Sequence, residues 1–266
     1  MQDRLRNADI DSFSKLNRVA LKTLDQQAKQ LPLSSGAVQW SPIEQYVTRM
    51  QAAVLTPDKS ALDDIVADMR QSKIAACDIA DLYIPTVARR LGECWVQDTL
   101  NFSAVSIGSA RLQSLLWQLE AIWSVGNTEV CTPHTDILLV IPDGCQHTLG
   151  ASVLAGQLRR LGFCVQLEAN VNRPVLIHLL QAKAFAAVMI SASSRESVET
   201  LKNLVRTARR ENATIPILIG GNVLDRPEDI ALATGADLAT SDIQTALAYC
   251  GLDDSVDVAT SLRQVG

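Results

Sequence analysis

The sequence predicts an α/β domain with a five-stranded parallel sheet in its second half, preceded by an all-α domain built as a four-helix bundle. Two observations favour this fold class. From residue 135 onward, short runs rich in aliphatic and β-branched residues alternate with helical patterns. These runs are almost continuously apolar, which is typical of a parallel sheet that helices cover on both faces.

The composition describes an ordered, mildly acidic protein. The chain has 266 residues, of which 47% are hydrophobic, and its formal net charge is −5. This length is enough for two domains with buried cores, and the negative charge argues against a domain that wraps nucleic acid. The first residues lack the apolar core of a signal peptide, and no run approaches the length of a membrane span. We therefore expect a cytoplasmic protein with no membrane segment.

The first half is expected to form four helices, at residues 42–55, 60–72, 77–97 and 101–123. Ser41, Pro42 and Glu44 are typical of a helix start, with a serine cap and a proline in the first turn. Short connections between the helices favour an up-and-down bundle over residues 41–124. Residues 1–40 would form a helical extension and a linker, because residues 12–31 show an amphipathic helical pattern.

The second half is expected to form an α/β domain over residues 135–250, between a linker at 125–134 and a tail at 251–266. Its five strands are predicted at residues 136–142, 163–169, 186–192, 215–221 and 236–240. Three features predict helix ends: Gly162 after a helix, Ser193 with Glu196 as a capping box, and Pro227 in a first turn. This rhythm favours a flavodoxin-like, doubly wound sheet, in which ligands bind beyond the carboxyl ends of the strands where the strand order reverses.

Polar and small residues occupy the expected ligand-binding edge of the sheet. They are Asp143 and His147 after the first strand, Ser191 and Ser193 after the third, and Gly220 and Gly221 after the fourth. A phospho-receiver domain is excluded, because Ser191 stands where the phosphorylated aspartate would be. The sequence also lacks a GxGxxG turn after a strand and a Walker loop, so nothing supports nucleotide binding.

The helix after His147 contains an unusual number of small residues, among them Gly150 and Gly156. Glycine inside a helix costs about 1 kcal/mol relative to alanine, so its presence suggests that another group approaches closely. Gly220 and Gly221 remove side chains from the facing edge of the sheet. Together these residues predict a slot between this helix and the sheet, with His147 at its mouth.

This segment resembles the cobalamin-binding domain of methionine synthase and its relatives, whose signature is DxHxxG, then SxL, then GG. His147, Thr148, Leu149 and Gly150 match HxxG at the family's spacing from the serine and glycine motifs. The resemblance implies that His147 is the lower axial ligand of cobalt. It also implies that the displaced nucleotide tail fills the slot beside Gly150, Gly220 and Gly221, with a hydrogen bond from Ser191.

The signature is altered at two positions. Cys145 replaces the aspartate that orients the histidine in the family, and a thiol performs that role poorly. Asp143 is the residue that could reach the imidazole instead. Ser193 replaces the leucine of SxL and makes that loop more polar.

Residues 82–116 resemble the helical module that precedes cobalamin domains in methionine synthase and in light-responsive CarH-type regulators. In that module an aromatic residue after a glycine covers the upper face of the corrin, and Gly92 and Trp95 match this pattern. Val105 and Ser106 stand where CarH-type proteins have a Glu-His pair, so this module offers no upper imidazole ligand.

The form "QHTLG" at residues 146–150 is similar to the PpaA/AerR family of photosynthesis-gene regulators. That resemblance implies a cobalamin-binding antirepressor, not an enzyme, whose partner is a DNA-binding transcriptional repressor and which does not bind DNA itself. Some relatives bind haem, so haem is an alternative cofactor and a haem-based redox sensor an alternative function. The sequence is also compatible with a corrinoid methyl-shuttle protein and with a scaffold that binds no cofactor. The six cysteines lack CxxC or zinc spacing and are expected to be thiols.

Overall fold

A computed structural model describes residues 42–58, 60–124, 135–145, 147–193, 196–221 and 227–252. The predicted N-terminal extension, the linker at 125–134 and nearly all of the tail lie outside the described residues. Contacts divide the described residues into two compact units, one with those of 42–73 and 86–109, and one with those of 74–85 and of 110–252. The domain borders predicted from the sequence stay predictions.

The first unit is helical. It contains α2 (Pro42–Leu55), α3 (Ser60–Gln71), most of α5 (Ile84–Val96) and the start of α6 (Phe102–Ser124). Val47, Met50 and Val54 recur on one face of α2 and are fully buried, as the amphipathic pattern requires. Ion pairs add to this packing, because Arg90 donates to Glu44 at 2.6 Å and Arg49 lies 2.6 Å from Asp68.

The helix predicted over residues 77–97 is interrupted. It consists of α4 (Ala76–Asp78), the π-helical turn η1 (Ile79–Tyr83) and α5. Pro85, in the first turn of α5, has no N–H, and its ring would clash with the carbonyl of Asp81 in a regular α-helix. The backbone widens ahead of it, so that the N–H of Ile84 donates to the carbonyl oxygen of Ile79.

The second unit contains the sheet, and the predicted fold class is confirmed. The strands are β1 (Asp136–Pro142), β2 (Cys164–Val171), β3 (Ala187–Ser191), β4 (Ile217–Gly220) and β5 (Leu238–Ala239). Their order is β2-β1-β3-β4-β5, and every neighbouring pair is parallel, which is the flavodoxin-like arrangement. All seven residues of β1 are buried, because this strand has neighbours on both edges and helices on both faces.

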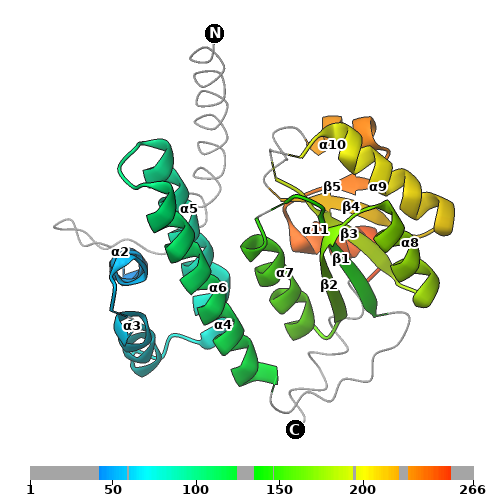
Figure 1. Cartoon of the computed structure of the whole chain (residues 1–266). Helices are drawn as coiled ribbons and strands as arrows, with labels where there is room; N and C mark the ends of the chain where they lie inside the picture. The colour runs from blue at the N-terminus through cyan, green and yellow to red at the C-terminus, as the bar shows by residue number, and fades with distance from the viewer. Residues whose placement is uncertain are drawn as a thin grey trace, which may run out of the picture. The chain divides into compact units, whose positions relative to one another are not determined.

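The helices cover the two faces of the sheet (Figure 1). They are α7 (Leu149–Arg160), α8 (Arg173–Ala182), α9 (Val198–Glu211), α10 (Pro227–Thr234) and α11 (Ile243–Tyr249). One core holds Leu138 and Val140 of β1 with residues of α8, α9 and α10, and the other holds Ile137 and Leu139 with residues of α7 and α11. The alternation of β1 side chains between the two cores follows from the period of two in a strand.

Two of the predicted helix ends are confirmed, and one is wrong. Gly162 follows α7 with a φ of +97°, and its N–H donates to the carbonyl oxygen of Arg159. Pro227 is the first residue of α10. The cap of α9 is Ser197, which accepts from the N–H of Thr200, whereas the capping box predicted at Ser193 would begin the helix four residues too early.

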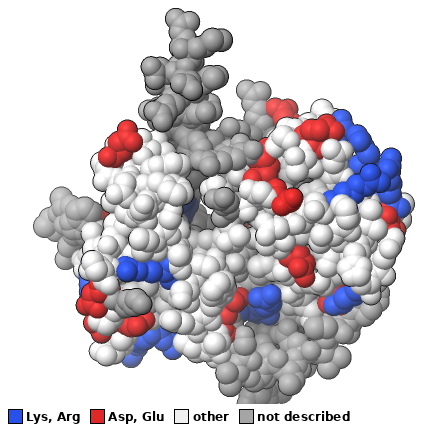
Figure 2. Space-filling model, in the orientation of Figure 1, with Lys and Arg blue, Asp and Glu red and all other residues white. Residues whose placement is uncertain are grey.

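Three further findings concern charged residues, cysteines and membrane-spanning helices. Figure 2 shows lysine and arginine atoms gathered over α9. On this helix Arg209 donates to Asp237 at 2.6 Å and to the carbonyl oxygen of Ile215 at 2.9 Å. Cys164 is disulfide-bonded, which contradicts the expectation of six thiols, while Cys145 is among the free ones. No helix within the described ranges is long and apolar enough to cross a membrane.

Candidate cofactor site at the carboxyl edge of the sheet

His147 lies where the strand order reverses. β1 is flanked by β2 and β3, so the loops that follow β1 and β3 leave the sheet side by side. After β1 the chain turns at Gly144, which has a φ of +81°, and the N–H of Cys145 donates to the carbonyl oxygen of Pro142 at 3.1 Å. His147 follows this turn and is exposed. The imidazole is therefore available to a ligand and does not belong to the core.

Thr148 and Leu149 connect His147 to α7. Thr148 is the N-cap of α7 but makes no side-chain capping bond, and Leu149 is half-buried. The first N–H groups of a helix and its dipole create a positive potential at this end. Asp143, which the sequence suggested as a partner of the imidazole, is exposed on the loop that also carries His147.

Cys145 is buried beneath the loop that carries His147. Its side chain is 7% exposed. Burial raises the pKa of the Cys145 thiol, and the Glu196 carboxylate beside it raises that pKa as well, whereas hydrogen bonds from the His147 backbone N–H and the Ser193 hydroxyl lower it. The thiol thus stays protonated and packs between the loops after β1 and β3.

Glu196 lies beside Cys145, although the sequence predicted for it only a role in a helix cap. Its carboxylate accepts the backbone N–H of Ser193, and it also lies against the Cys145 side chain. Ser193 is buried, whereas Ser191 at the end of β3 is half-buried and is paired in the sheet with Gly220. A carboxylate therefore borders the residue two positions before His147, although it comes from a different loop from the one that the family signature predicts. The signal available in the sequence was its spacing of three from Ser193.

The three glycines of the predicted slot differ in their surroundings. A Cβ on Gly221, which has a φ of +103°, would lie 2.2 Å from the carbonyl oxygen of Ala192. A Cβ on Gly220 would lie 3.1 Å from the carbonyl oxygen of Thr240. The backbone therefore requires glycine at position 221, whereas a side chain at position 220 would be in tight contact with the backbone of Thr240. A Cβ on Gly150 would meet nothing within 4 Å, so Gly150 faces open space that an incoming group can fill.

Trp95 lies in the other unit, near the end of α5. Its half-buried ring is tilted by 59° to the ring of Phe102, with 6.2 Å between the centroids. Phe102 is 64% exposed, so this aromatic pair consists of one half-buried and one exposed side chain. The role of Trp95 as a cover for the corrin stays a prediction.

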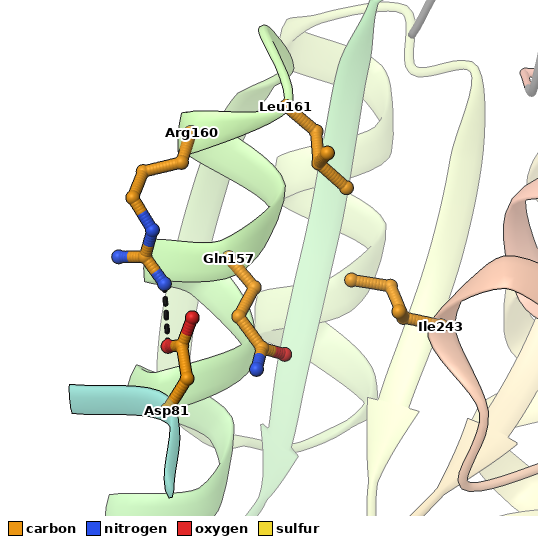
Figure 3. A pocket seen from close by; sticks show the side chains of 5 residues that line it. All are labelled: Asp81, Gln157, Arg160, Leu161 and Ile243. Carbon is orange, nitrogen blue, oxygen red and sulfur yellow. Dashed lines mark hydrogen bonds and ion pairs between the residues drawn. The ribbon is translucent and has the colours of Figure 1, made fainter. Parts of the chain in front are cut away.

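A cavity of about 190 Å³ lies elsewhere in the second unit (Figure 3). Its lining comes from η1, from α7 and the residue after it, and from α11: Asp81, Gln157, Arg160, Leu161 and Ile243. Arg160 donates to Asp81 at 2.5 Å across it. Burial raises the pKa of the Asp81 carboxyl in spite of this bond, because the cost of removing the charge from water outweighs the attraction. Ligand pockets commonly measure about 300–1,000 Å³, so this cavity is too small to be the site of a cofactor as large as a corrinoid.

Comparisons with known proteins identify the kind of domain that contains the sheet. Residues 135–244 match the B12 binding domain family. The chain is 31% identical over 192 residues to the "Uncharacterized 20.5 kDa protein in bchF-crtJ intergenic region" of Rhodobacter capsulatus, a match that spans 72% of this chain and 100% of the relative. The matched family is one that binds B12, which gives no support to the haem alternative.

A solved structure shares the fold. The monomethylamine corrinoid protein of Methanosarcina barkeri superposes with a TM-score of 0.62 over 82% of this chain and 98% of that protein, at 12% sequence identity. At this identity the likeness shows the fold alone.

Proposed function

We propose, since this chain belongs to the same family as the Rhodobacter capsulatus protein and contains a B12-binding domain, that it is a cobalamin-binding regulator of transcription. In this proposal it is not an enzyme. It acts in the cytoplasm as the antirepressor of a DNA-binding repressor, and cobalamin supplies the signal-dependent change.

The observation that carries the binding proposal is the exposed His147 at the reversal point of the sheet, next to open space at Gly150. An imidazole nitrogen on a rim loop can bind a metal ion without disturbing a core. When bound, cobalamin would supply a cobalt ion that such a nitrogen can bind. His147 would be that ligand, Gly150 would admit the nucleotide tail, and Ser191 would hydrogen-bond the tail.

Glu196 supports a difference in chemistry from the family signature. A carboxylate that accepts the ring N–H of a metal-bound histidine fixes the ring and makes it a stronger ligand. Here the carboxylate beside Cys145 comes from the loop after β3, and it is already held by the Ser193 N–H. The His147 backbone N–H and the Glu196 carboxylate both contact the Cys145 thiol, so in this proposal a change at His147 reaches the loop that leads into α9 through Cys145.

The regulatory part of the proposal rests on the relative and on charge. The relative's gene lies between bchF and crtJ, in a photosynthesis gene cluster, and the QHTLG motif is similar to that of PpaA/AerR antirepressors. The net charge of −5 disfavours direct binding to the phosphate backbone, because Lys and Arg contacts supply most non-specific affinity for DNA. A protein partner that binds DNA is consistent with both observations.

The competing function is that of a corrinoid methyl shuttle, which is compatible with the fold shared with the monomethylamine corrinoid protein. A shuttle would accept and release a methyl group with a methyltransferase. Incubation of the reconstituted protein with such an enzyme and its methyl donor tests this directly, and turnover of a methylated cofactor would replace the regulatory proposal.

Two experiments test the proposal in sequence. The purified protein is reconstituted separately with hydroxocobalamin, adenosylcobalamin and haem, and spectra are recorded in darkness and after illumination. We expect retention of a cobalamin and not of haem. Mobility-shift assays are then run with a photosynthesis-gene promoter, with and without the repressor. The proposal predicts no shift by this chain alone and a weaker repressor shift when it is added, whereas tight, sequence-specific binding by this chain alone contradicts it.

A further inference from the structure

The exposed face of α6 carries no charged residue. Over residues 102–122 of this helix, for which burial is described, ten residues are exposed, and all ten are apolar, small or uncharged polar. Six of them recur at alternating spacings of three and four and form one stripe, the α6 seam: Ser103, Ile107, Ala110, Ser114, Trp117 and Ala121. The two charged residues of the helix, Arg111 and Glu120, are half-buried and lie off this stripe. A solvated helix usually shows charges on its outer face, so this seam is unusual for a surface that stays in water.

Large apolar side chains stand on and beside the seam. Trp117 is 61% exposed and Ile107 is 53% exposed, and the flanking Phe102 and Ile122 are 64% and 58% exposed. The alternating spacing of three and four is the spacing by which one helix packs along another. The small residues Ala110 and Ser114 at its centre allow the two backbones to approach closely.

The seam is symmetric about Leu112, which identifies the partner. Ile107 and Trp117 each lie five residues from Leu112, and Ala110 and Ser114 each lie two residues from it. Ser103 and Ala121, and likewise Phe102 and Ile122, are placed at equal distances in the same way. If two such helices pair antiparallel, every large side chain meets a large one and every small side chain meets a small one. This self-complementarity is what a two-fold symmetric interface requires.

We propose that the α6 seam is a self-association surface, through which two copies of this chain pair antiparallel around a two-fold axis near Leu112. Since the seam is uncharged, a second copy meets no like-charge repulsion there. The exposed side chains offer on the order of 500 Å² per copy, less than the roughly 800 Å² per partner of a standard stable interface. The dimer is therefore weak and reversible. This inference does not depend on the cofactor or on the proposed regulatory role.

Sedimentation velocity of the full-length protein, from low micromolar to near-millimolar concentration, tests the proposal. We expect a reversible monomer–dimer equilibrium. Trp117→Glu and Ile107→Arg should each weaken it at least tenfold, because each places a charge against an apolar side chain of the second copy. Leu232→Arg is the matched control, since Leu232 is 87% exposed on α10 and a charge there should leave the equilibrium unchanged. Far-UV circular dichroism checks that each variant is folded.

A mixing experiment tests the register. In the antiparallel arrangement, the arginine introduced by Ile107→Arg in one copy faces the glutamate introduced by Trp117→Glu in the other, while the second contact keeps the native Ile107 and Trp117. An equimolar mixture of the two variants should therefore form a heterodimer, although each variant alone stays monomeric. Monomeric wild-type protein at every concentration overturns the proposal, as does an equilibrium that the seam variants leave unchanged. Dimerisation without recovery in the mixture overturns the antiparallel register.

Discussion

Replacement of Gly221 by alanine should lower the stability of the apoprotein substantially. The φ of +103° at this position is one that residues with a side chain rarely adopt, and the added Cβ would lie 2.2 Å from the carbonyl oxygen of Ala192. Backbone strain of this kind costs about 1–3 kcal/mol. Relief of the contact must also displace the end of β3, where the N–H of Ala192 donates to the carbonyl oxygen of Gly220 at 2.8 Å. The loss of that bond adds about 1 kcal/mol, so we expect a total of about 3 kcal/mol.

Gly150→Ala is the matched control. A Cβ on Gly150 meets nothing within 4 Å and α7 is helical there, so alanine should raise the free energy of unfolding by about 0.5 kcal/mol. Urea unfolding followed by far-UV circular dichroism measures both variants, with a two-step fit if the two units unfold separately. If Gly221→Ala stays within about 0.5 kcal/mol of wild type, less than the strain alone should cost, the close approach of the chain after β4 to Ala192 is refuted.

Three other predictions concern the site, the cavity and the thiols. Gly150→Leu should leave the fold intact and prevent retention of cobalamin, while a corrinoid without the nucleotide tail still binds. Gel filtration of the variant with each corrinoid measures retention, and normal retention of intact cobalamin would place the slot elsewhere. Arg160→Gln should lower the free energy of unfolding at pH 7 by about 2 kcal/mol, because Asp81 would lose its cation, whereas Asp81→Asn should change it by less than about 1 kcal/mol. Burial raises the pKa of Asp81 above its ordinary 3.8, so the folded protein binds this proton more tightly than the unfolded chain does. The stability that Asp81 contributes should therefore be lost as pH rises through the raised pKa. A loss of stability on acidification that disappears in Asp81→Asn would contradict this. Cys145 should react with iodoacetamide at pH 8 more slowly than the half-buried Cys77, because burial restricts access to the Cys145 thiol and raises its pKa. Mass spectrometry of timed samples measures both rates, and equal rates would show that the loop over Cys145 is open.

The sheet could be predicted from sequence because β1, β3 and β4 come from almost continuously apolar runs, whereas β2 contains polar residues and is recognised by its place in the alternation of strands and helices. "DILLVIP" gave the bounds of β1 without error, since all seven side chains are buried. β5 is harder to place, because only Leu238 and Ala239 pair with the neighbouring strand. The turn η1 could not be predicted from periodicity, because π and α turns bury similar faces and the cause is the ring of Pro85.

The candidate site was predictable only in part. His147 and the glycines follow from motif spacing, whereas their different roles do not: Gly221 is required by the backbone of Ala192, and Gly150 faces open space. Glu196 was assigned to a cap because its spacing from Ser193 fits one, and the contact with Cys145 depends on two loops that are distant in sequence. Contacts of this kind arise from strand order, which local patterns do not specify.

Electron paramagnetic resonance of the bound cofactor in its Co(II) state tests the central claim, that His147 binds the metal, most directly. The nuclear spin of the axial nitrogen splits the cobalt lines, so the protein is prepared with ¹⁵N-labelled histidine and loaded with unlabelled cobalamin. The account predicts that labelling changes each three-line pattern into a two-line pattern, and that His147→Ala loses the two-line pattern. A three-line pattern that labelling leaves unchanged would mean that the nucleotide base of the cofactor still binds cobalt, and it would contradict the role assigned to His147.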